Sequence, residues 1–372
     1  MRAIVNTGPG KLEMREVSKP LPGRGQVRIR TGACAICATD LAMIAGWERT
    51  PFGSIPGHEW AGTVDAAGEG VDSSLVGRRC VAENVWTSDG GEVGFEHPGG
   101  YAEYFVTEAA NVHVLPDDFD LTAAALIEPL AVCVRAVKRL ARAASILEVR
   151  GSELGRTLIM GDGPIGLLMT AILRTGVLVG GRQHRLMLAR ELGADSTINY
   201  HDLTPGNPAD GIRRARRGVF PEMAEFQTII EASGSDAAMQ ASLDLAAVGA
   251  RVLVIGDYGA ARAGFPWNRI LHRELELIGS NASAGAWGEA VALATRVGTV
   301  PPSGTVPLSG TVPSFSGPPK GNNRGQSQTA GLSPLPLARL VSHVLPAERF
   351  AEGVEMTRSK HAGVIKVVLR WE

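Results

Sequence analysis

The stretch that decides the fold is Gly161-Asp162-Gly163-Pro164-Ile165-Gly166, which directly follows the apolar segment Thr157–Met160 and opens a second apolar segment. It fits the pattern G-x-G-x-x-G. The first glycine permits a tight turn, the second lets the backbone approach a pyrophosphate, and the third lets a helix and a strand pack closely. A purely structural glycine turn is the alternative, but the strand before and the helix after favour a dinucleotide site. We expect contacts to the cofactor from Gly161, Gly163, Pro164, Ile165 and Gly166.

The sequence on both sides of this motif alternates between strand-like and helix-like segments. Such alternation predicts a parallel sheet covered by helices. The expected strands are Thr157–Met160, Val177–Val179, Thr228–Glu231 and Arg251–Ile255. The expected helices are Ile165–Arg174, His184–Leu192 and Ala237–Leu245.

The strand Val177–Val179 ends in Gly180-Gly181-Arg182, where dinucleotide sites usually carry an acidic residue for the ribose hydroxyls. Without that carboxylate, and with the Arg182 guanidinium close by, a 2′-phosphate is better tolerated. We therefore expect NAD or NADP as cofactor, with NADP used at least as well as NAD. Arg182 as an ordinary loop residue remains the alternative. The helix between Gly166 and this strand is shorter than such units normally carry.

The first 130 residues have a different character, with short β-rich runs separated by glycine and proline. The expected strands are Gln26–Thr31, Gly62–Ala67, Gly77–Glu83, Tyr101–Val106 and Asn111–Leu115. An alanine- and leucine-rich helix is expected over Leu121–Ala144. Near the other end of the chain, Leu335–Leu340 and Ala347–Met356 are typical of helix or turn, and Val364–Leu369 of a closing strand.

Composition limits the class of protein. The chain has 372 residues, which suggests two domains, and a net charge of −1, which gives no cationic field for nucleic acid or an anionic membrane. Four cysteines are too few for a disulfide scaffold. No secretory signal is visible, and the longest apolar runs are too short to span a bilayer. We therefore expect a cytoplasmic protein with neither nucleic acid nor membrane as partner.

Residues 298 to 334 differ from the rest of the chain. The tetrapeptide GTVP occurs three times at a six-residue period, starting at Gly298, Gly304 and Gly310, and text rich in serine, glycine, proline and asparagine follows. This composition buries too little apolar area to offset its ordering entropy. We expect a flexible insertion rather than a solenoid, and expect its removal to leave folding and activity largely intact.

Two kinds of nicotinamide or carbonyl chemistry are excluded by the positions of tyrosine and lysine. The tyrosine-lysine pair of short-chain dehydrogenases needs Tyr-x-x-x-Lys, but the fourth residue after each tyrosine is Phe105, Glu108, Thr204 or Arg262. No lysine lies between Lys138 and Lys320, so the nucleotide-binding half offers no Schiff-base nucleophile.

The N-terminal half carries a candidate metal site instead. Cys37, His58 and Glu59 bring a thiolate, an imidazole and a carboxylate into one domain, a mixture that suits zinc. His58-Glu59 is not the HExxH of a metalloprotease, because Gly62 stands where the second histidine would be. Cys34 and Cys37 form a CxxC that fits a redox pair or half a zinc knuckle, although no second pair follows.

Together these residues resemble the zinc-dependent medium-chain dehydrogenase/reductase (alcohol dehydrogenase) family, in particular its sorbitol, polyol and sugar dehydrogenase branch. The motifs occur in the family's order and extend over nearly the whole chain outside 298–334. They are Ile36–Asp40, Gly57–Gly62, Gly99–Tyr104, Leu126–Leu130, Gly161–Gly166 and Glu231–Gly234.

The resemblance implies a catalytic zinc bound by Cys37, His58 and Glu59, with Glu128 as a direct or water-bridged fourth ligand. It also implies that Thr39 supplies the hydroxyl of a proton relay and that Asp40 orients a zinc ligand. Many relatives carry four closely spaced cysteines for a second, structural zinc. No cysteine lies between Cys80 and Gly99 here, so we expect that zinc to be absent.

The fold implied is α/β, with a mostly β, GroES-like catalytic domain at 1–131 and 282–372 and a Rossmann domain at 132–281. The implied reaction is oxidation of a secondary alcohol of a polyol, sugar or amino-sugar-like compound in a homodimer or homotetramer. Three alternatives remain: L-threonine 3-dehydrogenase activity, a degenerate cofactor-binding relative without turnover, and a zinc protein without the redox step, such as a lyase.

Overall fold

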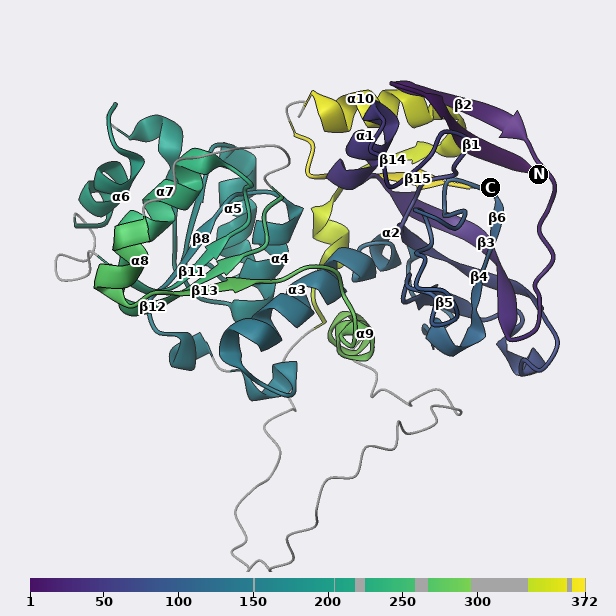
Figure 1. Cartoon of the computed structure of the whole chain (residues 1–372), viewed down its shortest axis with the longest axis horizontal. Coiled ribbons are helices and arrows are strands. Elements are labelled where there is room, and N and C mark those ends of the chain that lie inside the picture. The colour runs from purple at the N-terminus through teal and green to yellow at the C-terminus, as the bar shows by residue number, and fades with distance from the viewer. Residues whose placement is uncertain are drawn as a thin grey trace, which may run out of the picture.

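The computed structural model describes residues 1–149, 151–203, 205–217, 225–257, 267–295, 334–359 and 363–371. Two lobes are visible, a helix-covered sheet and a β-rich lobe that carries both ends of the chain (Figure 1). The insertion expected at 298–334 lies outside the described residues, apart from residue 334. Within the described part of the chain, no helix has the length and apolar character needed to cross a membrane.

The first lobe is built on a six-stranded parallel sheet with the strand order β10-β9-β8-β11-β12-β13. This confirms the predicted parallel sheet. The strands are β8 (Thr157–Met160), β9 (Val177–Gly180), β10 (Ser196–Asn199), β11 (Phe226–Glu231), β12 (Ala246–Val254) and β13 (Glu276–Gly279). The order reverses between β8 and β11, and ligands of such sheets bind at the carboxyl ends of the strands where the order reverses.

Both faces of this sheet are covered, which explains why its strands are apolar throughout. On β8, Leu158 packs into one apolar core and Ile159 into the other, as the alternation of side chains along a strand requires. The helices of this lobe are α4 (Pro164–Leu173), α5 (Gln183–Glu191), α6 (Pro208–Arg217), α7 (Asp236–Leu245) and α8 (Trp267–Arg273).

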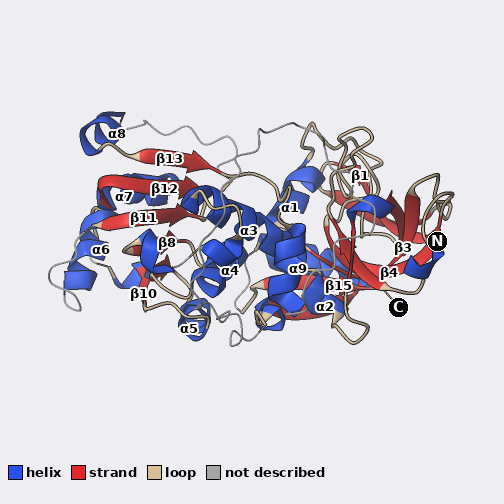
Figure 2. Ribbon diagram, turned by 90° about the horizontal axis from the view of Figure 1, so that it is seen from below, coloured by secondary structure: helices blue, strands red, loops and turns tan. Residues whose placement is uncertain are grey.

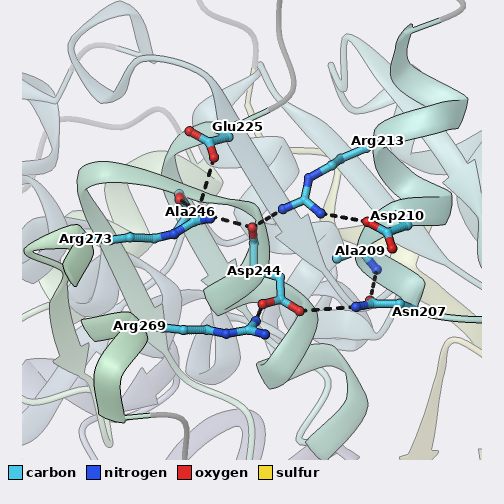
Figure 3. A network of polar contacts seen from close by, with 9 residues as sticks. All are labelled: Asn207, Ala209, Asp210, Arg213, Glu225, Asp244, Ala246, Arg269 and Arg273. Carbon is cyan, nitrogen blue, oxygen red and sulfur yellow. Dashed lines mark hydrogen bonds and ion pairs between the residues drawn. The ribbon is translucent and has the colours of Figure 1, made fainter. Parts of the chain in front are cut away.

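Arginines secure the end of the lobe farthest from the β-rich half. Arg213 and Arg273 both donate to the carbonyl oxygen of Asp244, in the last turn of α7, and Arg269 pairs with the Asp244 carboxylate (Figure 3). Carbonyl oxygens at a helix end lack partners within the helix and attract cations. This network ties α6 and α8 to α7, well away from the glycine-rich turn.

The second lobe contains a seven-stranded sheet with the order β14-β15-β3-β4-β5-β7, in which β6 also pairs with β3. A two-stranded sheet, β1 with β2, adds to it. The strands are β1 (Arg2–Gly8), β2 (Lys11–Glu16), β3 (Gln26–Ala35), β4 (Glu59–Ala67), β5 (Arg79–Ala82), β6 (Tyr104–Glu108), β7 (Val112–Val114), β14 (Val341–Pro346) and β15 (Lys366–Arg370). The helices are α1 (Ala38–Ala45) and α10 (Phe350–Arg358).

One predicted element is wrong in its extent. The single helix expected over Leu121–Ala144 is two helices, α2 (Leu121–Ala124) and α3 (Ile127–Ala141). Pro129 explains the break, because proline has no backbone N–H and fits only into the first turn of a helix. The division brings Glu128 to the start of a new helix instead of the middle of a long one.

The two lobes share one apolar core. It extends from Ala61 and Val368 in the β-rich lobe, through Leu130 of α3, to Leu168 of α4. Figure 2 shows α3 and α9 (Trp287–Thr295) between the two sheets, and the two helices pack against each other. Residues on the two lobes are therefore held in a fixed relation by packed side chains.

Candidate active site

Cys37, His58 and Glu59 come from two neighbouring elements of the β-rich lobe. Cys37 is the residue before α1, His58 is the residue before β4, and Glu59 is the first residue of β4, which pairs with β3. One metal-binding atom from each lies within 4.8 Å of the other two. The structure thus brings together the three side chains that the sequence singled out.

The turn before His58 requires glycine. Gly57 has φ +101°, a conformation that other residues adopt only with strain. A Cβ atom there would also lie 2.7 Å from the backbone nitrogen of Tyr101. On the other side of the turn, the Asn84 side chain donates to the His58 carbonyl oxygen at 2.8 Å. The backbone position of His58, from which the imidazole extends, is therefore fixed by the Gly57 turn and by Asn84.

Asp40 connects the parts of the cluster. Its carboxylate is fully buried, and Oδ2 accepts hydrogen bonds from the backbone N–H of Cys37 at 2.8 Å and from the Tyr101 hydroxyl at 3.0 Å. Its Oδ1 lies 3.3 Å from Nδ1 of His58. Burial alone would lower the pKa of His58, but the charges of Asp40 and Cys37 outweigh burial and raise it. This is the arrangement of a carboxylate that orients a metal-binding histidine.

Sequence reasoning missed Lys366. Its ammonium donates to Oε1 of Glu59 at 2.6 Å, and both side chains are almost completely buried. Burial would lower the pKa of Lys366, but the adjacent Glu59 carboxylate, with Cys37 and Asp40, raises it above its usual value. A single lysine in the apolar segment Val364–Leu369 was the signal that could have identified it.

The cluster fits a zinc ion. Glu59 Oε2 is buried and has no hydrogen-bond partner among the described residues, so this oxygen lacks the partner that a buried carboxylate needs. A thiolate, an imidazole and a carboxylate are also the donor types that zinc accepts. Because a positive ion between Cys37, His58 and Glu59 would satisfy the free oxygen, we assign these residues as candidate metal ligands.

Glu128 lies at the edge of this cluster. It is buried at the start of α3 and is not one of the three residues within 4.8 Å of one another. Burial raises its pKa to about 7, and the nearby charges of His58 and Lys366 oppose that shift while Glu59 adds to it. Glu128 is thus close enough to respond to the cluster, and its role as fourth ligand stays a prediction.

The other cysteines are structural. Cys34, Cys80 and Cys133 are buried free thiols, and burial raises the pKa of each. Cys34 packs in the apolar core with Trp60 and Tyr101, and both Cys34 and Cys37 are free thiols. The alternative of a Cys34–Cys37 redox pair therefore has no support in the packing.

An aromatic wall adjoins His58. The Phe95 ring lies 4.9 Å from the His58 ring, and Trp47 meets Phe95 edge to face. Arg49 stacks on Phe95 with its guanidinium carbon 4.4 Å from the ring centre, and forms ion pairs with Glu92 and Glu96. The cation beside this wall is thus neutralised by two carboxylates.

The glycine-rich turn has the geometry that a dinucleotide requires. Gly161 has φ +115°, and a Cβ atom on Gly166 would lie 1.9 Å from the Gly161 carbonyl oxygen. By contrast, a Cβ atom on Gly163 would meet nothing within 4 Å, so the backbone is open at the start of α4. Pro164 occupies the first turn of that helix, where its missing N–H costs nothing.

At the end of β9, sequence reasoning missed a carboxylate. Asp162 Oδ2 accepts the backbone N–H groups of Gly181 and Arg182 at 3.0 and 2.8 Å. Its Oδ1 lies 3.1 Å from the Arg182 guanidinium and 3.8 Å from that of Arg185. A Cβ atom on Gly180 would lie 2.4 Å from the Asp162 Cβ. Arg182 is therefore beside this edge as expected, but it is paired.

Comparison with known families matches both halves of the chain. Residues 23–117 match the alcohol dehydrogenase GroES-like domain, and residues 165–296 match the zinc-binding dehydrogenase domain. The first match contains the three candidate metal ligands, and the second begins within the glycine-rich turn.

Curated relatives are similar over most of their length. An L-threonine 3-dehydrogenase of Saccharopolyspora erythraea is 30% identical over 307 residues, which are 75% of this chain and 83% of the relative. A sorbitol dehydrogenase of Halalkalibacterium halodurans is 26% identical over 327 residues, which are 79% of this chain and 88% of the relative.

Two solved structures share the fold. A putative zinc-binding dehydrogenase from Sinorhizobium meliloti bound to NADP has a TM-score of 0.79 at 21% identity, covering 100% of this chain and 99% of the other. An alcohol dehydrogenase from Escherichia coli CFT073 complexed with NADH has a TM-score of 0.78 at 21% identity, with the same coverage. At this identity the likeness shows the fold.

Proposed function

The chain belongs to the zinc-dependent medium-chain alcohol dehydrogenase family and is an NAD(P)-linked alcohol oxidoreductase, and we propose that it oxidises a secondary alcohol of a polyol, sugar or amino-sugar-like compound to the ketone, reversibly. The observation that carries the proposal is the cluster of Cys37, His58 and Glu59, in which one Glu59 oxygen has no hydrogen-bond partner among the described residues.

The proposed zinc ligands are Cys37, His58 and Glu59, with Glu128 as a direct or water-bridged fourth. A zinc ion at such a site supplies Lewis acidity, which lowers the pKa of an alcohol. The Asp40 carboxylate faces Nδ1 of His58 at 3.3 Å and accepts a hydrogen bond from the backbone N–H of Cys37. Lys366 donates to one oxygen of Glu59, and the other oxygen has no hydrogen-bond partner in the part of the chain that the structure describes.

Thr39 is the proposed proton carrier. Its hydroxyl lies 3.6 Å from the Cys37 sulfur, and the residue is half-buried in the first turn of α1. A hydroxyl can accept and donate a proton without carrying charge itself. We propose that Thr39 accepts the proton of the alcohol hydroxyl and passes it toward solvent. The hydride moves from the carbon that bears this hydroxyl to the nicotinamide.

The cofactor is proposed to bind on the turn at Gly161–Gly166, with its adenosine ribose at Gly180 and Arg182. We propose that NADP is used at least as well as NAD. Two guanidinium groups, Arg182 and Arg185, face a single carboxylate at the end of β9, which leaves a positive balance for a 2′-phosphate.

The aromatic wall supports an uncharged substrate. The Arg49 guanidinium is engaged by Glu92 and Glu96, so binding a phosphorylated sugar there would have to displace those ion pairs. L-threonine is the second candidate, because the L-threonine 3-dehydrogenase relative is 30% identical.

The proposal also includes one zinc per chain, a homodimer or homotetramer, no nucleic acid or membrane partner, and a cytoplasmic location.

Two measurements test the proposal together. Elemental analysis of the purified protein is expected to give one zinc per chain, and absorbance of the reduced nicotinamide is expected to rise with a polyol or sugar alcohol in a panel that includes L-threonine, inositols and sugar phosphates. Turnover of L-threonine alone would select the second candidate. A protein without zinc after zinc-replete preparation would contradict the mechanism, and two tightly held zincs would contradict the single site.

A further inference from the structure

The carboxylate missing from the end of β9 has been replaced in space by one from the glycine-rich turn. In dinucleotide sites an acidic residue about 20 residues after the motif hydrogen-bonds the ribose 2′-hydroxyl. This chain has Gly180 there, but the space that a Gly180 side chain would fill holds the Asp162 side chain, whose Cγ would lie 2.7 Å from that Cβ. The two positions are thus mutually exclusive for a side chain.

Asp162 is built into this place. Its side chain is 7% exposed, and three hydrogen bonds reach its oxygens, from the backbone N–H groups of Gly181 and Arg182 and from the Arg182 guanidinium. Arg185 also reaches this turn and donates to the Asp162 backbone carbonyl oxygen at 3.2 Å. Arg185 is itself fixed by the Val364 carbonyl oxygen from the end of the chain.

From this arrangement we propose that Asp162 determines the preference between NAD and NADP, in the role that a residue at the end of β9 usually has. The inference rests on the proposed nicotinamide site. The Asp162 carboxylate repels a 2′-phosphate and competes with it for the Arg182 guanidinium. Asp162 thereby keeps NAD a usable cofactor beside two arginines.

The test measures nucleotide binding without turnover, by titration calorimetry with 5′-ADP and 2′,5′-ADP. Wild type is compared with Asp162→Asn, which keeps an oxygen for the two backbone N–H groups but removes the charge. We expect Asp162→Asn to bind 2′,5′-ADP more tightly relative to 5′-ADP by roughly tenfold. The gain is expected to vanish in Asp162→Asn/Arg182→Ala.

Two further variants serve as controls. One tests for a general effect of charge, and the other tests whether the altered binding comes from a loss of folding. Asp202→Asn removes an exposed carboxylate after the neighbouring strand β10 and is expected to leave the ratio unchanged. Asp162→Gly/Gly180→Asp places the carboxylate at the end of β9 instead. Position 162 becomes glycine in this variant because a Cβ atom at 162 would clash with the new Cβ atom at 180. We expect this exchange variant to bind 5′-ADP, relative to 2′,5′-ADP, more tightly than Asp162→Asn does.

The outcomes separate this inference from the proposed function. An unchanged or lower preference for 2′,5′-ADP in Asp162→Asn, or an equal gain in Asp202→Asn, would overturn the role of Asp162 while leaving the dehydrogenase proposal intact. Failure of wild type to bind either nucleotide would overturn the cofactor site and this inference together. Binding with the expected ratios but no oxidation of any alcohol would overturn the proposed reaction alone.

Discussion

Asp40 and Asp162 are both buried carboxylates that accept backbone hydrogen bonds, and they differ in the origin of their partners. Asp40 accepts from Cys37, three residues earlier, at the first turn of α1. Asp162 accepts from Gly181 and Arg182, about twenty residues later, across the edge of the parallel sheet. The backbone partner of Asp40 is therefore local to one helix start, although Tyr101 also donates to this carboxylate, whereas both backbone partners of Asp162 lie in another loop.

This difference explains which site is easier to recognise. The role of Asp40 was inferred from the family motif Ile36–Asp40, in which the carboxylate stands three residues after Cys37 at one helix start. A carboxylate that crosses between loops leaves no pattern at a fixed spacing. Three of the four predictions below test these two sites, and the fourth tests a buried histidine outside both.

The largest expected effect is loss of the metal. Cys37→Ser removes the thiolate from the three-ligand cluster, and we expect zinc content to fall from one per chain to near zero and kcat/KM for alcohol oxidation to fall about a thousandfold or more. Elemental analysis and steady-state kinetics measure both. Cys80→Ala, a buried cysteine on β5, is the matched control and should retain zinc. Full zinc content in Cys37→Ser would remove Cys37 from the ligand set.

A smaller loss is expected from the residue that orients the cluster. Asp40→Asn keeps the shape of the side chain but removes the charge facing His58, and we expect zinc affinity to fall about 10- to 100-fold. Competition with a chelator measures the affinity. Asp65→Asn is the control, since this carboxylate pairs with Arg28 and Lys19 at the other end of β4. Equal losses in the two variants would show that Asp40 acts only through general charge.

At the nucleotide edge, Arg182→Ala removes the guanidinium beside Gly180. We expect kcat/KM with NADP to fall about tenfold relative to kcat/KM with NAD, because a charge-assisted hydrogen bond to the 2′-phosphate is lost. Steady-state kinetics with both cofactors measure the ratio. The control is Arg190→Ala, an exposed arginine farther along α5. A ratio that is the same in wild type and Arg182→Ala would identify Arg182 as a loop residue.

The smallest expected effect concerns His113, a histidine whose pKa is shifted by burial alone. Burial lowers the pKa of His113, which stacks on Trp287 where β7 meets α9. Below a pH of about 6.5 the His113 imidazole becomes protonated in the unfolded chain but stays neutral in the folded state. The free energy of unfolding therefore decreases as pH falls. We expect His113→Asn, relative to wild type, to lose about 2 °C less in melting temperature between pH 7.5 and 5.5.

The control for this prediction is His201→Asn, an exposed histidine in the turn after β10. Its melting temperature should follow that of wild type at both pH values. If His113→Asn also follows wild type, burial of the imidazole does not contribute to acid sensitivity.

Much of the fold could be predicted because short patterns encode it. The strand Thr157–Met160 was predicted to the residue, and the parallel sheet around it followed from the alternation of strands and helices. The edge strand β10 was missed because its residues are only half-buried and carry a weaker apolar pattern. The break between α2 and α3 was missed because the apolar pattern continues across it.

By itself, the sequence determined the glycine-rich turn, the three candidate metal ligands and the family, because each rests on residue types at fixed spacings in the chain. Only the tertiary structure decided that Lys366 neutralises one oxygen of Glu59 and that Asp162 occupies the place of the carboxylate absent from Gly180. The physical reason is distance along the chain. Glu59 and Lys366 are 307 residues apart, and their pairing depends on how β4 and β15 come to lie in one sheet, which local backbone preferences do not specify.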